Sequence, residues 1–161
     1  MSTPRLLIAY DGSPNARTAV HAAAALFPGA EAVVFFARQP MEAFAAHLQG
    51  HPVLEGLDGL DAALLDASEK IAAAGAEFAV TLGLRAQPLV SSSVVSASEA
   101  IIAAAEDRDS GLIVLGSRGR RGLTATVLGS TSADVLHHAT RPTLVIPSDA
   151  VALPRSAVTQ D

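Results

Sequence analysis

Five short apolar runs, separated by segments of helical periodicity, constrain how this 161-residue chain can fold. Continuous apolar runs of this length are typical of parallel strands that are buried on both faces. The expected strands lie within residues 5–10, 32–37, 84–91, 112–115 and 143–146. Because a helical pattern stands between each strand and the next, we predict one α/β domain. Its doubly wound, five-stranded parallel sheet is expected to carry helices on both faces.

The expected helices have recognisable ends. Ser13 is followed by a proline, which predicts a helix start because proline at the first helical position loses no hydrogen bond. Ser96 and Glu99 have the spacing of a capping box. The longest amphipathic pattern begins at Leu60 and is expected to end near Gly75.

Two segments fall outside the alternating pattern. Residues 41–57 contain scattered glycine and proline, and we expect a flexible excursion there. Residues 148–161 are expected to form a mobile C-terminal tail. Since neither an internal repeat nor a second domain is visible, residues 1–147 are predicted to be the folded unit.

The composition argues against several classes of function. The net charge is −5 and aromatic residues make up 4% of the chain, so the basic face and stacking rings that bind nucleic acid are not expected. The absence of cysteine excludes disulfides, thiol catalysis and thiolate metal sites. The apolar runs are too short to cross a bilayer, and the first 15 residues lack the hydrophobic region of a signal peptide. A cytoplasmic globular protein is therefore expected.

The fourth expected strand leads into a glycine-rich segment and then into a helix. Gly116 and Gly119 are followed, after nine residues, by Gly129, and Ser130 or Thr131 is expected to cap the helix. This arrangement favours phosphate, because exposed N–H groups and the helix dipole both attract an anion. Glycine also lets the backbone approach the anion without an intervening side chain.

Charged residues accompany this predicted anion site. Arg118, Arg120 and Arg121 together would bias it toward anions, although any one of them alone can simply be a solvated loop charge. Asp11 follows the first strand, and would face the glycine segment if the first and fourth strands were neighbours. It can also form a turn beside Ser13, and the two roles are compatible.

These motifs resemble the universal stress protein family. The resemblance rests on Asp11-Gly12-Ser13 after the first strand and on Gly116-x-x-Gly119-x9-Gly129-Ser130 after the fourth. It implies a Rossmann-like, universal stress protein-like nucleotide-binding domain over residues 1–147, and the glycine spacing is that of members that bind ATP. It also implies a stress-response protein that forms a homodimer through its fifth strand, Pro142 to Ile146.

The resemblance further implies roles for individual residues. Around the phosphates and ribose it places Gly116, Gly119, Gly129, Ser130 and Thr131.

The adenosine half of the ligand is expected near the first two strands. By resemblance, Asp11, with Ala9 before it, approaches the adenosine. The backbone of Arg38 stands where the family contacts adenine, although the family usually has a small apolar residue there. Mg²⁺ can accompany the triphosphate, but no carboxylate cluster dedicated to this ion stands out.

The sequence predicts little or no catalysis. It contains no Gly-x-x-x-x-Gly-Lys-Ser/Thr loop, and its single lysine, Lys70, lies on the long helix. Asp11 is the nearest candidate base, whereas fast phosphoryl transfer needs a positioned metal, a base and a cationic clamp together. We therefore expect an ATP-binding regulatory protein with at most slow hydrolysis. A nucleotide-free interaction module of the same fold and a slow ATPase remain the alternatives.

The histidines do not indicate a dedicated metal site. His47 and His51 are four residues apart, but a glycine lies between them and a proline follows. His137 and His138 are adjacent, and are expected to point to different sides of a helix.

Overall fold

The structure is a computed structural model that describes residues 2–39, 57–93, 95–118 and 128–148. In chain order its elements are β1 (Leu6–Ala9), α1 (Pro14–Leu26), β2 (Glu31–Arg38), α3 (Leu57–Thr81), β3 (Arg85–Ser92), α4 (Ala97–Asp107), β4 (Leu112–Gly116), α5 (Ser130–His138) and β5 (Thr143–Ile146). The predicted excursion at 41–57 and the predicted tail at 148–161 lie almost entirely outside the described residues.

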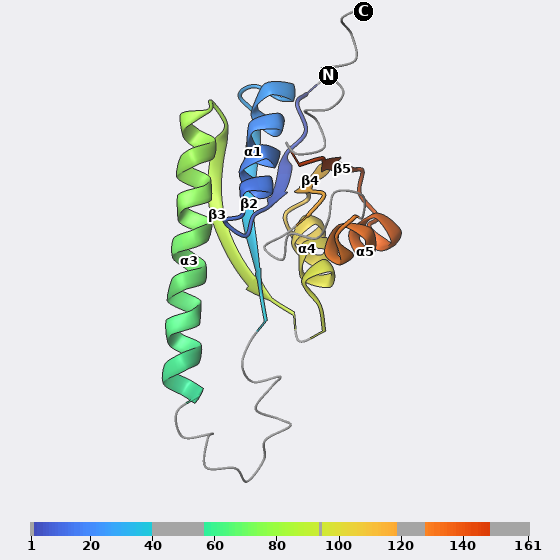
Figure 1. Ribbon diagram of the computed structural model, residues 1–161. Helices are drawn as coiled ribbons and strands as arrows, with labels where there is room; N and C mark the ends of the chain where they lie inside the picture. The colour runs from blue at the N-terminus through green and yellow to red at the C-terminus, as the bar shows by residue number, and fades with distance from the viewer. Residues whose placement is uncertain (1, 40–56, 94, 119–127, 149–161) are drawn as a thin grey trace, which may run out of the picture.

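All five strands are parallel and form one sheet in the order β3-β2-β1-β4-β5 (Figure 1). At its centre, Leu6 of β1 lies opposite Ala32 of β2 on one side and Leu112 of β4 on the other. The chain winds outward from β1 to β3 and then returns to β4, so the winding reverses between β1 and β4. This confirms the predicted doubly wound α/β fold, and places its switch point beside β1.

The helices cover both faces of the sheet. Leu6 and Ile8 pack in a core with α1 and α3, whereas Leu7 packs on the opposite face with α4 and α5. All three side chains are fully buried. Burying such a side chain contributes about 1.5–3 kcal/mol, so both faces of β1 anchor the fold.

Two helix starts follow the sequence signals. The Ser13 side chain accepts a hydrogen bond from the Ala16 N–H at 3.1 Å, and a proline occupies the first turn of α1. The Ser96 side chain accepts one from the Glu99 N–H at 3.2 Å at the start of α4. Each bond satisfies a backbone donor that the helix itself leaves unpaired.

Two expected helix ends are wrong. α3 continues through Gly75 to Thr81, because this glycine permits close packing rather than ending the helix. A Cβ at Gly75 would lie only 2.6 Å from the Tyr10 ring. α5 is capped by the backbone of Gly129 and not by Ser130 or Thr131, which instead lie in its first turn.

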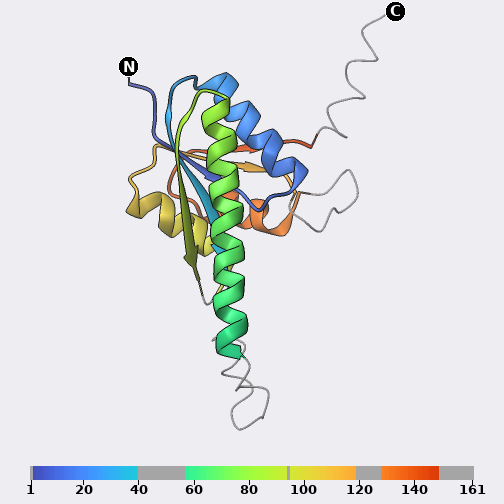
Figure 2. The same cartoon turned by 90° about the vertical axis from the view of Figure 1, so that its left-hand side faces the viewer.

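One side of the domain is elongated. β2 and β3 have eight residues each, whereas β1 and β5 have four. α3 has 25 residues, and its N-terminal end extends past the other described elements (Figures 1 and 2). Among the described residues, no helix is both long and apolar enough to span a membrane.

Candidate functional site

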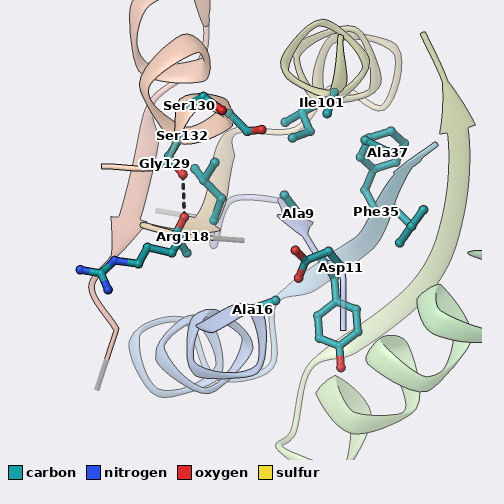
Figure 3. A pocket seen from close by; sticks show the side chains of 16 residues that line it. Ala9, Asp11, Ala16, Phe35, Ala37, Ile101, Arg118, Gly129, Ser130 and Ser132 are labelled. Carbon is teal, nitrogen blue, oxygen red and sulfur yellow. Dashed lines mark hydrogen bonds between the residues drawn. The ribbon is translucent and has the colours of Figure 1, made fainter. Parts of the chain in front are cut away.

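A pocket of about 480 Å³ lies at the carboxyl ends of β1 and β4 (Figure 3). The two strands are neighbours, so the loops that follow them face each other across the switch point. The residues that line the pocket come from β1, β2, β4, the starts of α1, α4 and α5, and the loops between them: Ala9, Tyr10, Asp11, Ala16, Phe35, Phe36, Ala37, Ala97, Ile101, Leu115, Gly116, Arg118, Gly129, Ser130, Thr131 and Ser132.

The structure brings together most of the residues predicted for the site. Seven of them line this one pocket: Ala9, Asp11, Gly116, Arg118, Gly129, Ser130 and Thr131. Gly119 lies outside the described residues, as do Arg120 and Arg121. Arg38 is not among the described residues that line the pocket, although the adjacent Ala37 is. The contacts of these residues with a ligand remain predictions.

Arg38 points its side chain toward α3. Its guanidinium forms an ion pair with Asp61 and also donates to the Asp61 carbonyl at 3.3 Å. The arginine side chain is 11% exposed, so the pair is largely removed from water. The ion pair therefore ties the end of β2 to α3.

Asp11 has the turn-forming role that its sequence context indicated. Its Oδ1 accepts a hydrogen bond from the Ser13 N–H at 2.9 Å, which fixes the turn between β1 and α1. In Figure 3 its carboxylate lies beside Ala9 at the edge of the pocket. A contact with ligand is compatible with this position, because a carboxylate can accept more than one hydrogen bond.

The backbone at the end of β4 is held by its neighbours. The Ser117 N–H donates to the Ile146 carbonyl at 2.8 Å, and the Gly129 N–H donates to the Ser117 carbonyl at 2.7 Å. The Arg118 N–H donates to Asn15 Oδ1 at 2.8 Å. These three amides are therefore occupied within the protein and are not free to bind an anion.

The amides that remain available are at the start of α5. Its first helical hydrogen bond joins the Ala133 N–H to the Gly129 carbonyl at 2.9 Å. Within the described part of the chain, the N–H groups of Ser130, Thr131 and Ser132 have no partner, as expected for a first turn. All three residues line the pocket, so the positive end of the helix dipole faces it.

The opposite wall of the pocket is apolar. Ala9 of β1, Ala37 of β2 and Ile101 of α4 lie across the pocket from Arg118 and Gly129 (Figure 3). Arg118 directs its guanidinium away from this wall. The site thus combines an end that carries open N–H groups with an apolar end, an arrangement that suits an amphipathic ligand.

Asn15 is a site residue that the sequence interpretation missed. It lies on α1, is 8% exposed, and bonds to the loop after β4. The sequence does contain a signal for it, because Asn15 is spaced four residues from Ala19 and eight from Ala23, and so falls on the buried face of the same helix. A polar side chain in an apolar stripe needs buried partners, and one of its partners here, Arg118, lines the pocket.

The histidines that the structure describes are not grouped with other potential metal ligands. Among the residues described, no group of three histidine, aspartate or glutamate side chains is placed to hold a metal ion. His137 and His138 are exposed, and His138 Nδ1 lies 2.9 Å from the Asp134 carbonyl. His47 and His51 lie outside the described residues.

A model of the universal stress protein family matches residues 3–147. The chain therefore belongs to the universal stress protein family. No curated protein matches it.

Several solved structures share this fold. The hypothetical protein MJ0577 is 19% identical with a TM-score of 0.74, over 91% of this chain and 97% of that one. The Archaeoglobus fulgidus universal stress protein in complex with dAMP is 19% identical with a TM-score of 0.58, over 90% and 98%. A universal stress protein in complex with cAMP is 18% identical with a TM-score of 0.57, over 92% and 100%. At these identities the likeness concerns the fold.

Proposed function

We propose that this protein is a regulatory protein of the stress response that binds ATP or a related adenine nucleotide in the pocket between β1 and β4. The observation that carries the proposal is the division of the pocket into two ends. Three open N–H groups stand at the start of α5, and an apolar wall lies opposite them. A nucleotide has the same division, with an anionic tail and a flat, largely apolar base.

Two proteins of similar fold support adenine as the base. One was solved in complex with dAMP and the other with cAMP. Membership of the universal stress protein family supports a role in the stress response.

We assign the phosphates to the start of α5. Ser130 and Thr131 would donate their N–H groups and hydroxyls, and Gly129 would leave room for the close approach. Gly119, which lies outside the described residues, is assigned to the phosphates by resemblance to the family. Mg²⁺ would accompany a triphosphate as a counter-ion.

The adenosine half is assigned to the other end of the pocket. Asp11 would accept a hydrogen bond from the ribose, and the backbone around Ala37 and Arg38 would meet the adenine edge. The apolar side chains of Ala9 and Ile101 would pack against the base.

A homodimer through β5 belongs to the same proposal. β5 is the last strand of the described sheet, and three of its four residues are only partly buried. An edge strand of this kind offers unpaired backbone groups to a second copy. Nucleotide would signal by favouring one form of the dimer, to the extent that it binds the two forms with different affinity.

Hydrolysis would be slow at most. Asp11 is the one acidic side chain among the described residues that line the pocket, and its Oδ1 already accepts the Ser13 N–H. A fast enzyme would also need a positioned metal and a cationic clamp. If ATP were turned over, replacing Asp11 with Asn should lower that rate.

Mass spectrometry of the small molecules released by heating the purified protein tests the proposal. We expect an adenine nucleotide, and calorimetry should show binding of added ATP. An empty protein that also fails to bind ATP would instead be a nucleotide-free interaction module of the same fold.

Gly129→Val tests the location of the site. Gly129 has φ −59, which valine can adopt, but a Cβ there would lie 3.1 Å from the Ser117 carbonyl oxygen. We expect the affinity for ATP to fall at least about tenfold, since the side chain blocks the approach to α5. Gly59→Ala is the matched control, because nothing lies within 4 Å of a Cβ there. Equal affinity in all three proteins would place the nucleotide elsewhere.

A further inference from the structure

We propose that Asn15 is a positioning residue that fixes the anion-binding end of the pocket. The inference rests on the proposed function, because it concerns the same pocket. Asn15 is the only asparagine of the chain and lies in the first turn of α1, 8% exposed. It would act on the ligand through the backbone that it holds, without touching the ligand itself.

The carboxamide of Asn15 joins two distant segments. Its Oδ1 accepts hydrogen bonds from the Arg118 N–H at 2.8 Å and from the Ser117 hydroxyl at 3.3 Å. Its Nδ2 donates to the Ile146 carbonyl at 3.3 Å. The loop after β4 and the end of β5 are thus tied to one side chain of α1.

These partners require an amide at position 15. Arg118 and Ser117 offer donors, whereas Ile146 offers an acceptor, so the side chain must both accept and donate. Aspartate at neutral pH could only accept, and leucine could do neither. Because the group is buried, removing it would leave the Arg118 N–H without its partner.

The same contact explains why Gly116 has no side chain. A Cβ at Gly116 would lie 2.8 Å from Asn15 Cγ, so any other residue would displace the carboxamide. The Gly116 carbonyl in turn accepts a hydrogen bond from Ser132 Oγ at 2.7 Å (Figure 3). Asn15, the end of β4 and the first turn of α5 therefore form one connected unit, and that turn carries the open N–H groups.

Asn15→Ala tests the assignment through the phosphates of the ligand. We expect the dissociation constant for ATP to rise about tenfold, as for the loss of a buried hydrogen bond that orients the site. The dissociation constant for adenosine should stay unchanged, because adenosine has no phosphate. Hydrogen exchange at the Arg118 amide should accelerate about tenfold or more, while exchange in β1 stays slow.

Gly116→Ala provides a second variant that keeps the asparagine but displaces it. It should reproduce the selective loss of ATP affinity. In the double variant Asn15→Ala with Gly116→Ala the loss should be no greater than in Asn15→Ala alone, because both changes disturb one contact. If the double variant raised the dissociation constant by the product of the two single-variant factors, Gly116 would act on the ligand independently of Asn15. That result would overturn this part of the assignment.

Ser98→Ala is the matched control. Ser98 occupies the same position in α4 as Asn15 does in α1, is 6% exposed, and lies 3.0 Å from Ser96 Oγ. It should leave ATP affinity unchanged. An Asn15→Ala protein that binds ATP as well as the wild type, or that loses ATP and adenosine affinity equally, would overturn the inference.

The proposed function can fail separately. If the wild-type protein binds no nucleotide, the proposed function is wrong. Hydrogen exchange at the Arg118 amide then tests by itself whether Asn15 holds the backbone after β4. An unchanged exchange rate in Asn15→Ala would refute that role.

Discussion

Gly59 and Gly75 lie in the same helix in opposite surroundings. At Gly59 nothing lies within 4 Å of the position that a Cβ would take. At Gly75 that position is 2.6 Å from Tyr10 Cδ1 and 2.9 Å from Val34 Cγ1. Gly59 is therefore only a weak helix former, whereas Gly75 allows α3 to approach the sheet.

Alanine at these two positions should change stability in opposite directions. Gly59→Ala should raise the free energy of unfolding by about 0.5–1 kcal/mol, because alanine loses less backbone entropy in a helix. Gly75→Ala should lower it by about 1–3 kcal/mol through overpacking. Urea unfolding of both variants measures the difference. A stabilised Gly75→Ala protein would show that the contact with Tyr10 relaxes easily.

The residues that were predicted correctly have local partners. Ser13 caps the helix that follows it, and Asp11 bonds to the Ser13 N–H two residues on. Asn15 was missed because its partners, Arg118 and Ile146, lie more than 100 residues away in the sequence. Only the fold brings them together.

At the scale of elements, the first half of α3 is weakly attached. From residue 62 to residue 67 every side chain is exposed, and Ser68 is the next buried one. The ion pair between Asp61 and Arg38 joins this half to the sheet. By contrast, the pair between Asp66 and Lys70 lies within the helix and is largely exposed.

Asp61→Ala should loosen the start of α3. We expect faster hydrogen exchange between residues 60 and 67, and a loss of about 1 kcal/mol of stability because the guanidinium of Arg38 loses a largely buried partner. Exchange after Ser68 should not change. Asp66→Ala is the control: its partner Lys70 has a raised pKa because of the hydrogen bond with Asp66, but the pair is solvated. If both variants behaved alike, the ion pair to β2 would not hold the helix.

Element types were predictable and some element ends were not. The apolar runs identified all five strands, since period and length are local properties. The sequence predicts a helix end near Gly75, yet close packing against Tyr10 and Val34 overrides the weak helix propensity of this glycine. The adjacency of β1 and β4 does not follow from local patterns, because it depends on how the whole chain winds.

For the whole molecule, the proposed homodimer would form along the outer edge of β5. The Pro142 and Ile146 carbonyls accept hydrogen bonds from the Ile113 and Ser117 N–H groups. Since peptide groups alternate in direction along a strand, those of Val145 point away from β4. A second copy could pair with that outer edge.

Val145→Pro should prevent this pairing, because proline has no N–H and is tolerated on edge strands. The molar mass measured by light scattering should be twice 16.4 kDa for the wild-type protein and 16.4 kDa for the variant. Val145→Thr keeps the N–H and should remain a dimer. A dimeric Val145→Pro protein would assign the interface to another surface.

The hydrogen bond between the Gly129 N–H and the Ser117 carbonyl is 2.7 Å long and fixes the distance between two described positions of the chain, one before and one after residues 119–127. The entropy of closing a loop depends only weakly on its length. Residues 119–127 could therefore be lengthened, shortened or exchanged without a change in the rest of the domain. Grafting a glycine-serine linker over residues 119–127 should therefore leave the melting temperature nearly unchanged. A fall in ATP affinity in the same variant would show that this segment contributes to binding.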